Sequence, residues 1–246
     1  MKYDKKKAPT FDPSATVPTS RSYQLELLEE SLRRNIIIAL DTGAGKTHIA
    51  VLRIKTEVLE RETRKVILLP DKILIDNVAD GVRYESLQLS WFVAPTVALV
   101  EQQRDVIATH IPVSVGLVSG ASDPHQWKDP SLWRAIISSH RVMVTTPQVL
   151  LDALRHGYIS LGADISLLIF DEVHHAGKNH PYNAIMKEFY HALPPRGSPA
   201  ARETWVRPMV LGLTASPIFG GDPDQAFRYV SFQCFRVPRT NSPNLE

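Results

Sequence analysis

Two short groups of residues, far apart in the chain, have the composition needed to hold a nucleoside triphosphate. The first, Thr42–Thr47, has the sequence T-G-A-G-K-T and precedes a helical pattern. The second, Asp171–His174, has the sequence D-E-V-H and follows the apolar run Ile165–Phe170. A glycine-containing loop before a helix surrounds phosphates with backbone N–H groups, while paired carboxylates hold magnesium and address an attacking water. Together the two groups predict a site for ATP and Mg2+.

The loop residues have separate chemical roles. Gly43 and Gly45 let the backbone turn sharply and approach the phosphates closely. Lys46 supplies a positive charge to the β- and γ-phosphates, and the Thr47 hydroxyl is a magnesium ligand. The general pattern G-x-x-x-x-G-K-[ST] requires a glycine where this chain has Leu40, so only the shorter form T-G-x-G-K-T is matched. The expected ATP-binding residues of the loop are Thr42, Gly43, Ala44, Gly45, Lys46 and Thr47.

The acidic pair is expected at the carboxyl edge of a sheet, where α/β proteins bind their ligands. Asp171 is predicted to hold the magnesium ion, directly or through water. Glu172 is predicted to orient and deprotonate the hydrolytic water, which makes Glu172 and Lys46 the predicted catalytic residues. Taken alone, such a pair is commonly just a solvated strand end. The nearby histidines lack the H-E-x-x-H arrangement, so no zinc site is predicted, and His175 and His180 are expected to be structural or surface residues.

Composition indicates a single large domain. The 246 residues are 43% hydrophobic and 22% charged, which is ordinary for a globular protein able to bury a sizeable core. The net charge of +2 is too small to indicate a nucleic-acid partner by itself. One cysteine excludes an internal disulfide, and no apolar run approaches the roughly 20 residues that span a bilayer. The basic start, Met1–Lys7, is not followed by an apolar segment, so the expected location is the cytoplasm or nucleus rather than the secretory route or a membrane.

Strand-like and helix-like segments alternate, which predicts an α/β fold with a mostly parallel sheet and helices on both faces. Short β-branched runs that are apolar throughout, such as Ile36–Leu40, are typical of strands buried on both faces. The other expected strands are Val66–Leu69, Trp91–Ala94, Val113–Val118, Val142–Thr145, Ile165–Phe170 and Met209–Leu213. The expected helices are Tyr23–Arg34, Lys46–Glu62, Val97–Thr109, Ser131–Ser138, Gln148–Arg155 and Tyr182–Leu193. One domain is expected over residues 21–235, between a flexible basic tail at 1–20 and a flexible tail at 236–246.

Four further stretches, taken in order with the two groups above, resemble the first RecA-like domain of a superfamily 2 helicase of the DExH type. They are Arg21–Gln24, Ala94–Leu99, Thr145–Gln148 and Leu213–Ser216. The resemblance implies a RecA-like P-loop NTPase fold in which Gln24 reads the adenine base. It further implies nucleic-acid backbone contacts from Pro95, Thr96, Thr146 and Pro147, and coupling of ATP state to strand movement through His174, Thr214 and Ser216. Thr96 and Thr146 are individually also explained as plain helix caps, so it is the order of six motifs that makes chance implausible.

Within this family the chain resembles the amino-terminal helicase region of fungal Dicer-like proteins over about residues 20–216. The segments that carry this likeness are Tyr23–Thr47, Val97–Leu99, Gln148–Leu154, Asp171–Ala176 and Asn179–Tyr182. The resemblance implies ATP-coupled engagement of double-stranded RNA in RNA silencing and antiviral defence. It also implies a second RecA-like domain with an arginine finger, beyond the Leu213–Ser216 motif. The isolated chain is therefore expected to bind ATP but to hydrolyse it very weakly. A non-catalytic fragment that binds ATP or nucleic acid, and a DNA translocase fragment, remain as alternatives.

The spacing between Lys46 and Thr96 exceeds what one helix and one strand need. Two segments in this interval, Val66–Leu69 and Trp91–Ala94, are both strand-like and both precede a proline. Because the motif Pro95–Leu99 follows the second, we assign that segment to the family strand. Residues from about 66 to 88 are then expected to be an insertion.

Overall fold

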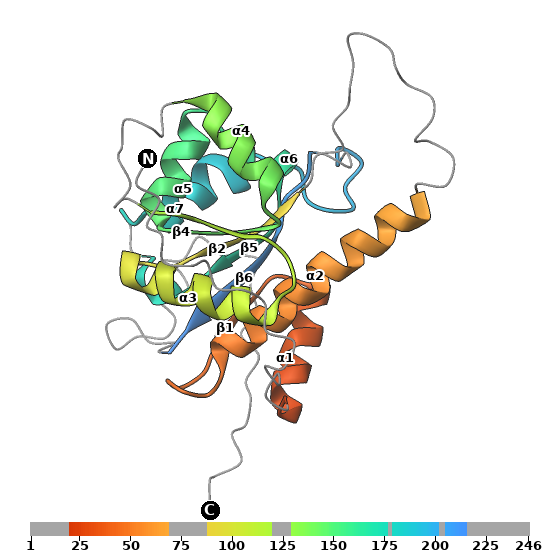
Figure 1. The fold of residues 1–246 in the computed structure, drawn as a ribbon, viewed down its shortest axis with the longest axis vertical. Coiled ribbons are helices and arrows are strands. Elements are labelled where there is room, and N and C mark those ends of the chain that lie inside the picture. Colours follow the sequence, from red (N-terminus) through yellow and green to blue (C-terminus); the bar gives the residue numbers. More distant parts are fainter. Residues whose placement is uncertain (1–19, 69–87, 120–128, 177–178, 202–204, 216–246) are drawn as a thin grey trace, which may run out of the picture.

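The computed structural model describes residues 20–68, 88–119, 129–176, 179–201 and 205–215. Within them six strands form one sheet in the order β1-β6-β5-β2-β4-β3, and every neighbouring pair is parallel (Figure 1). The strands are β1 (Ile36–Ala39), β2 (Leu89–Val93), β3 (Val115–Val118), β4 (Val142–Thr145), β5 (Ile165–Phe170) and β6 (Met209–Thr214). The predicted α/β fold with a parallel sheet is confirmed.

Helices cover both faces of the sheet, with α1, α2 and α3 on one side and α4, α5 and α7 on the other (Figure 1). Their bounds are α1 (Ser22–Arg33), α2 (Lys46–Leu68), α3 (Val97–His110), α4 (Pro130–Ser139), α5 (Pro147–Arg155), α6 (Leu161–Asp164) and α7 (Pro181–Ile185). Two short turns complete the described elements: the 3-10 turn η2 (Val173–His175) and the π-helical turn η3 (Met186–Tyr190). Among the described residues no helix combines the length and apolar character needed to cross a membrane.

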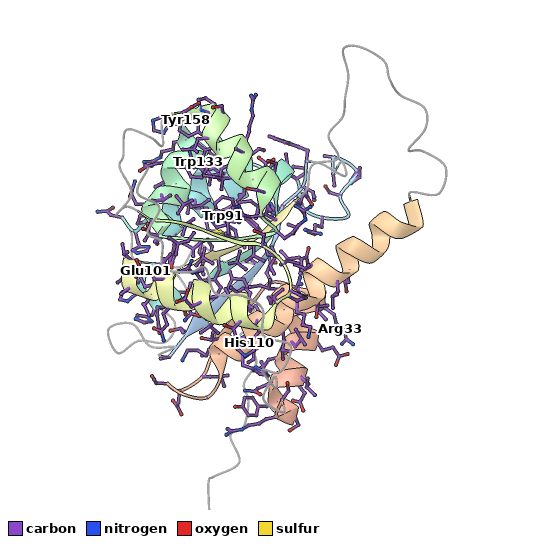
Figure 2. All side chains as sticks on the ribbon, viewed as in Figure 1. Arg33, Trp91, Glu101, His110, Trp133 and Tyr158 are labelled. Carbon is purple, nitrogen blue, oxygen red and sulfur yellow. The ribbon has the colours of Figure 1, made fainter. Side chains whose placement is uncertain are left out.

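The strands alternate their side chains between two apolar cores, as the two-residue period of a strand requires. Trp91 and Val93 of β2 belong to the core beneath α4, α5 and α7, whereas Phe92 between them belongs to the core beneath α1, α2 and α3. Figure 2 shows Trp91 at the centre of the molecule, where its Nε1 donates to Thr145 Oγ1 at 2.9 Å. The sheet is therefore buried on both sides.

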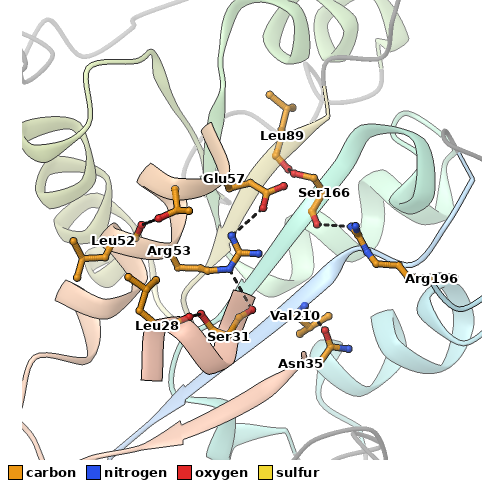
Figure 3. Close-up of polar contacts among 11 residues, drawn as sticks. Leu28, Ser31, Asn35, Leu52, Arg53, Glu57, Leu89, Ser166, Arg196 and Val210 are labelled. Atoms are coloured by element: carbon orange, nitrogen blue, oxygen red, sulfur yellow. Dashed lines mark hydrogen bonds and ion pairs between the residues drawn. The ribbon is translucent and has the colours of Figure 1, made fainter. Parts of the chain in front are cut away.

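Buried polar contacts tie the helices and strands together away from the carboxyl edge (Figure 3). Arg53 and Glu57 form an ion pair at 2.9 Å within α2, and Arg53 Nε donates to the Ser31 carbonyl of α1 at 3.4 Å. Asn35, just before β1, accepts a bond from the Val210 amide at 2.8 Å, which fixes β1 beside β6.

One predicted element is wrong. The strand expected at Val66–Leu69 is absent, because α2 continues through Leu68. The charged residues Glu60 to Lys65 are good helix formers, and the first helix breaker after Lys46 is Pro70, so the helical pattern is not interrupted before the apolar run. The helix expected over Tyr182–Leu193 is confirmed as far as Tyr190, because α7 continues directly into the π-helical turn η3, and it ends before Leu193. The predicted strand at Trp91–Ala94 is confirmed as β2, shifted by a residue or two.

Several domain predictions fall on residues that the structure does not describe. These are the two flexible tails, apart from Ser20, and the part of the expected insertion between residues 69 and 87. Ser216 of the last motif also lies outside the described residues.

Candidate nucleotide-binding site

The glycine loop joins the carboxyl end of β1 to the start of α2, as predicted. A turn closes it through the Ala44 amide, which donates to the Asp41 carbonyl at 3.1 Å. Gly43 and Gly45 have φ values of 83° and 87°, in the left-handed region that favours glycine. A Cβ at Gly45 would also lie 2.3 Å from Nε2 of Gln24, so a side chain here would have to displace the Gln24 carboxamide.

Helix α1 packs against the loop through the motif predicted to read adenine. Tyr23 Oη donates to the Ala44 carbonyl at 2.7 Å, and Gln24 Nε2 donates to the same oxygen at 3.2 Å. The side-chain oxygen of Gln24, Oε1, accepts from the backbone amide of Arg21 at 2.9 Å. A carboxamide has two N–H donors and two lone pairs, so these bonds use half of the capacity of Gln24. The residue is thus fixed beside the loop with capacity left for a base.

Lys46 lies over the loop. Its Nζ donates to the Leu40 carbonyl at 2.9 Å and to the Asp41 carbonyl at 3.3 Å. Both acceptors are neutral backbone carbonyls at the start of the glycine loop. Phosphate oxygens are stronger, charge-assisted acceptors of the same N–H groups.

Asp171 comes directly after β5 and is buried, with 7% of its surface exposed. Burial, and next the negative charge of Glu172, raise the pKa of Asp171 to about 6. Two effects oppose this rise: the Glu172 amide, which donates to Asp171 Oδ1 at 3.0 Å, and the positive charge of Lys46. Because β1 and β5 both pair in parallel with β6, the glycine loop after β1 and the acidic pair after β5 lie at the same edge of the sheet. The oxygens of a buried carboxylate are suitable ligands for a divalent cation such as Mg2+.

Glu172 has an unusual backbone. Its φ of 47° is the one positive value found for a non-glycine residue among the described residues. Its Oε2 lies 3.0 Å from Nδ1 of His174, and the same nitrogen lies 3.0 Å from Oγ1 of Thr214. Burial, and next His175, lower the pKa of His174, which favours the neutral ring. The structure therefore brings together His174 and Thr214, two of the three residues predicted to couple the ATP site to its neighbours.

Thr47, the other predicted magnesium ligand, begins the first turn of α2 together with Lys46. Its hydroxyl receives a long hydrogen bond of 3.5 Å from Nε2 of Gln103 on α3. Gln103 is buried, although the sequence Gln102-Gln103 gives no sign that either residue faces the interior. Sequence reasoning missed this residue, because only the packing of α3 on α2 brings it to the loop.

The residues predicted to contact nucleic acid follow β2 and β4, which are neighbours in the sheet. Pro95 is half-buried and Thr96 exposed; Thr96 Oγ1 accepts from the Leu99 amide at 3.3 Å and so caps α3. Thr146 precedes α5 without a side-chain capping bond, and Pro147 is buried in the first turn of that helix. Thr96 is therefore explained as a helix cap, whereas the hydroxyl of Thr146 has no capping role.

Helix α7 contacts the acidic segment, a role that the sequence did not reveal. Tyr182 is fully buried, and the single proton of its hydroxyl is shared between the Asp171 carbonyl at 2.8 Å and the Val93 carbonyl at 3.1 Å. Asn183 Nδ2 donates to the Ala176 carbonyl at 2.9 Å. His180 accepts from the Tyr182 amide at 3.2 Å and so caps the helix, whereas His175 is exposed.

Comparison with known proteins places the chain among helicases. A family model described as DEAD/DEAH box helicase matches residues 21–219. Dicer-like protein 2 of Aspergillus fumigatus is 44% identical over 199 residues, which is 80% of this chain and 12% of that protein. Dicer-like protein 2 of Cryphonectria parasitica is 41% identical over 204 residues, with 82% and 12% covered. The chain thus spans only a small part of the length of the curated relatives it matches.

A solved structure gives the same result for the fold. The helicase domain of Pyrococcus furiosus Hef is 25% identical and superposes with a TM-score of 0.58, covering 90% of this chain and 39% of that chain. The predicted resemblance to the helicase region of fungal Dicer-like proteins is confirmed, as is the RecA-like fold.

Proposed function

Because the chain belongs to the DEAD/DEAH box helicase family, we propose that it is the ATP-binding RecA-like domain, over residues 21–235, of a helicase that acts on double-stranded RNA. The observation that supports the site most strongly is the sheet topology, which places the segments that carry Lys46 and Asp171 at the same edge of the sheet. These residues come from the ends of β1 and β5, which are separated in the sheet by β6 alone. A cation from a glycine loop beside a buried carboxylate suits a magnesium-bound triphosphate.

Each residue of the site has a proposed task. The loop Thr42–Thr47 surrounds the phosphates, with Lys46 as the charged donor, and Gln24 binds the base. Thr47 and Asp171 hold the magnesium ion, which when bound supplies positive charge to the phosphate oxygens. Glu172 accepts a proton from the attacking water, and the neutral ring of His174 holds the carboxylate of Glu172 from the other side.

Efficient turnover is proposed to require a second RecA-like domain, in the same protein or from another, that completes the site with an arginine. Such arginines contribute about 10³–10⁵ in rate in comparable phosphoryl-transfer systems. The proposed setting is RNA silencing and antiviral defence in the cytoplasm or nucleus, by analogy with the Dicer-like relatives. Pro95, Thr96, Thr146 and Pro147 are the proposed contacts to the RNA backbone.

Nucleotide binding is tested by titrating a fluorescent ATP analogue with Mg2+ into the chain and into Lys46→Ala. We expect the variant to lose binding by tenfold or more, because a charge-assisted phosphate contact is removed (about 1.5–3 kcal/mol). Lys55→Ala, also on α2 but one residue beyond its second turn, is the matched control and should bind as the natural chain does. Equal binding by Lys46→Ala would overturn the assignment of the site.

The choice of nucleic acid is tested separately. Double-stranded RNA and DNA of the same sequence should compete for the chain at one stated salt concentration, since backbone contacts depend steeply on salt. Preference for RNA supports the proposal, and preference for DNA supports a translocase. Adding a separately expressed second RecA-like domain should raise ATP hydrolysis, whereas a chain that binds ATP but never turns over in its presence is a non-catalytic module.

A further inference from the structure

Tyr182 lies at a boundary within the carboxyl edge of the sheet. The glycine loop and the acidic pair, which are assigned to ATP, follow β1 and β5, and the residues assigned to nucleic acid follow β2 and β4. Strands β5 and β2 are neighbours, so the two groups meet there. The hydroxyl of Tyr182 shares its one proton between the carbonyl of Asp171 after β5, at 2.8 Å, and the last carbonyl of β2, on Val93, at 3.1 Å.

The hydroxyl is a dependable donor. Tyr182 is fully buried and its ring packs against Phe170, with 4.5 Å between the ring centroids. Burial, together with the charges of Asp171 and Glu172, raises the pKa of the Tyr182 hydroxyl well above its usual range. The group therefore keeps its proton throughout the working pH range of the protein.

The bond to Asp171 acts on the backbone of Glu172. The Asp171 carbonyl belongs to the peptide plane that precedes Glu172, and rotation of that plane changes φ of Glu172. This φ is 47°, a left-handed value that glutamate rarely adopts and that surrounding structure must maintain. A buried hydroxyl that binds the carbonyl at 2.8 Å holds the plane in this orientation.

Helix α7 holds the other end of the same segment as well. Asn183, next to Tyr182, donates to the Ala176 carbonyl at 2.9 Å. Within the segment, the His175 amide donates to the Glu172 carbonyl at 2.9 Å and the Ala176 amide to that of Val173 at 3.0 Å. Two consecutive side chains of α7 thus fix the start and the end of the segment 171–176.

We propose that Tyr182 is a positioning residue for ATP hydrolysis: its hydroxyl keeps Glu172 in the left-handed conformation that aims the carboxylate, while Asn183 fixes the end of the same segment. This inference rests on the proposed function, because it assigns to Tyr182 a role in the activity of that site. It predicts that loss of the hydroxyl slows the chemical step and leaves ATP binding unchanged.

The test compares Tyr182→Phe with Tyr190→Phe in the full chain. Tyr190 is also buried, and its hydroxyl accepts from Asn35 Nδ2 at 2.6 Å, before β1 and so at the opposite edge of the sheet. Both variants remove one buried hydroxyl and keep the ring. Three quantities are measured: the rate of a single turnover with protein in excess over labelled MgATP, the Kd of a fluorescent ATP analogue, and hydrogen exchange of the peptide covering 171–176.

For Tyr182→Phe we expect a single-turnover rate about tenfold lower, exchange in 171–176 faster by about two- to tenfold, and a Kd within about twofold of the natural chain. Tyr190→Phe should change none of the three, although it also loses a buried bond. Tyr182→Phe with natural rate and natural exchange would overturn the inference. So would a loss of rate shared equally by both variants, because that result indicates general loosening.

The outcomes separate this inference from the proposed function. If the natural chain turns over no faster than Glu172→Gln, the proposed hydrolysis fails, and the exchange of 171–176 still decides whether Tyr182 holds the segment. If Tyr182→Phe does not fold, Asn183→Ala removes the bond at the other end of the segment. Faster exchange and a lower rate in Asn183→Ala, at natural Kd, would support the α7 contact, and natural values of both would refute it.

Discussion

Replacing Asp171 with asparagine should stabilise the ligand-free protein above pH 6, although it removes a proposed magnesium ligand. The carboxylate is buried beside Glu172, and its pKa is about 6 in the folded state. In the unfolded chain an aspartate has a pKa of about 3.9. Between these two values the folded state keeps a proton that the unfolded state has released. The free energy of unfolding therefore falls as pH rises through this window and becomes level above the folded pKa.

The size of the effect follows from the two pKa values. A difference of about 2 units corresponds to about 3 kcal/mol at pH 8, because each unit is worth about 1.36 kcal/mol. Asparagine has no charge to desolvate and keeps an oxygen that can accept from the Glu172 amide, as Asp171 Oδ1 does at 3.0 Å. Asp171→Asn should therefore gain up to about 3 kcal/mol at pH 8 and almost nothing at pH 4. In a domain of this size that gain raises Tm by about 6–12 °C.

The assay is thermal and urea unfolding of both proteins in EDTA between pH 4 and pH 8. Asp105→Asn, at an exposed position of α3, controls for the loss of one negative charge. Adding MgATP should then raise the Tm of the natural chain and not that of Asp171→Asn. A variant that is less stable than the natural chain at pH 8, or a difference that does not change with pH, would refute the electrostatic reasoning.

Two further substitutions test other parts of the fold. Gly45→Ala should destabilise the protein by about 1–2 kcal/mol or more and weaken binding of the ATP analogue, because its Cβ would lie 2.3 Å from Gln24 Nε2 at a φ of 87°. Gly43→Ala is the control: Gly43 has a similar φ but open space around it, so the changes in Tm and Kd of this variant measure the cost of conformation alone. Identical behaviour of the two variants would contradict the packing argument. Arg53→Met should cost about 3–5 kcal/mol in urea unfolding because it removes the guanidinium that pairs with the buried Glu57 carboxylate at 2.9 Å, whereas Arg53→Met with Glu57→Leu should recover most of that loss. A double variant no more stable than the single one would show that the pair does not act as a unit.

The sequence predicted the sheet because its strands are locally distinctive. In apolar runs such as Ile36–Ala39 and Ile165–Phe170, side chains on both faces of the strand must be covered. Such strands are typical of a parallel sheet that has a layer of helices on each face. Once the sheet is parallel, residues after each strand share one edge, so the glycine loop and the acidic pair were expected together. The prediction from composition was wrong at Val66–Leu69, because a short apolar run with β-branched residues fits either a strand or the end of a long, uninterrupted helix.

Contacts between side chains distant in sequence were not predictable. In an amphipathic pattern Tyr182 is simply an apolar position, and its hydroxyl acquires a role only after α7 packs beside the ends of β2 and β5. Gln103 is similar, because its contact with Thr47 depends on how α3 lies against α2. Neither contact leaves a local signal of spacing or composition.

The two residues that break local rules are adjacent, and this is informative about how the site works. Asp171 is a buried carboxylate with a raised pKa, and Glu172 has a backbone conformation that glutamate rarely adopts. Both features lower the stability of the ligand-free fold, so the rest of the structure must maintain them. A cation bound to Asp171 would lower its pKa and so recover the free energy that burial costs. Folding and metal binding are therefore linked through one carboxylate, and ligand-dependent stabilisation should grow between pH 4 and pH 8 as the ligand-free protein loses stability.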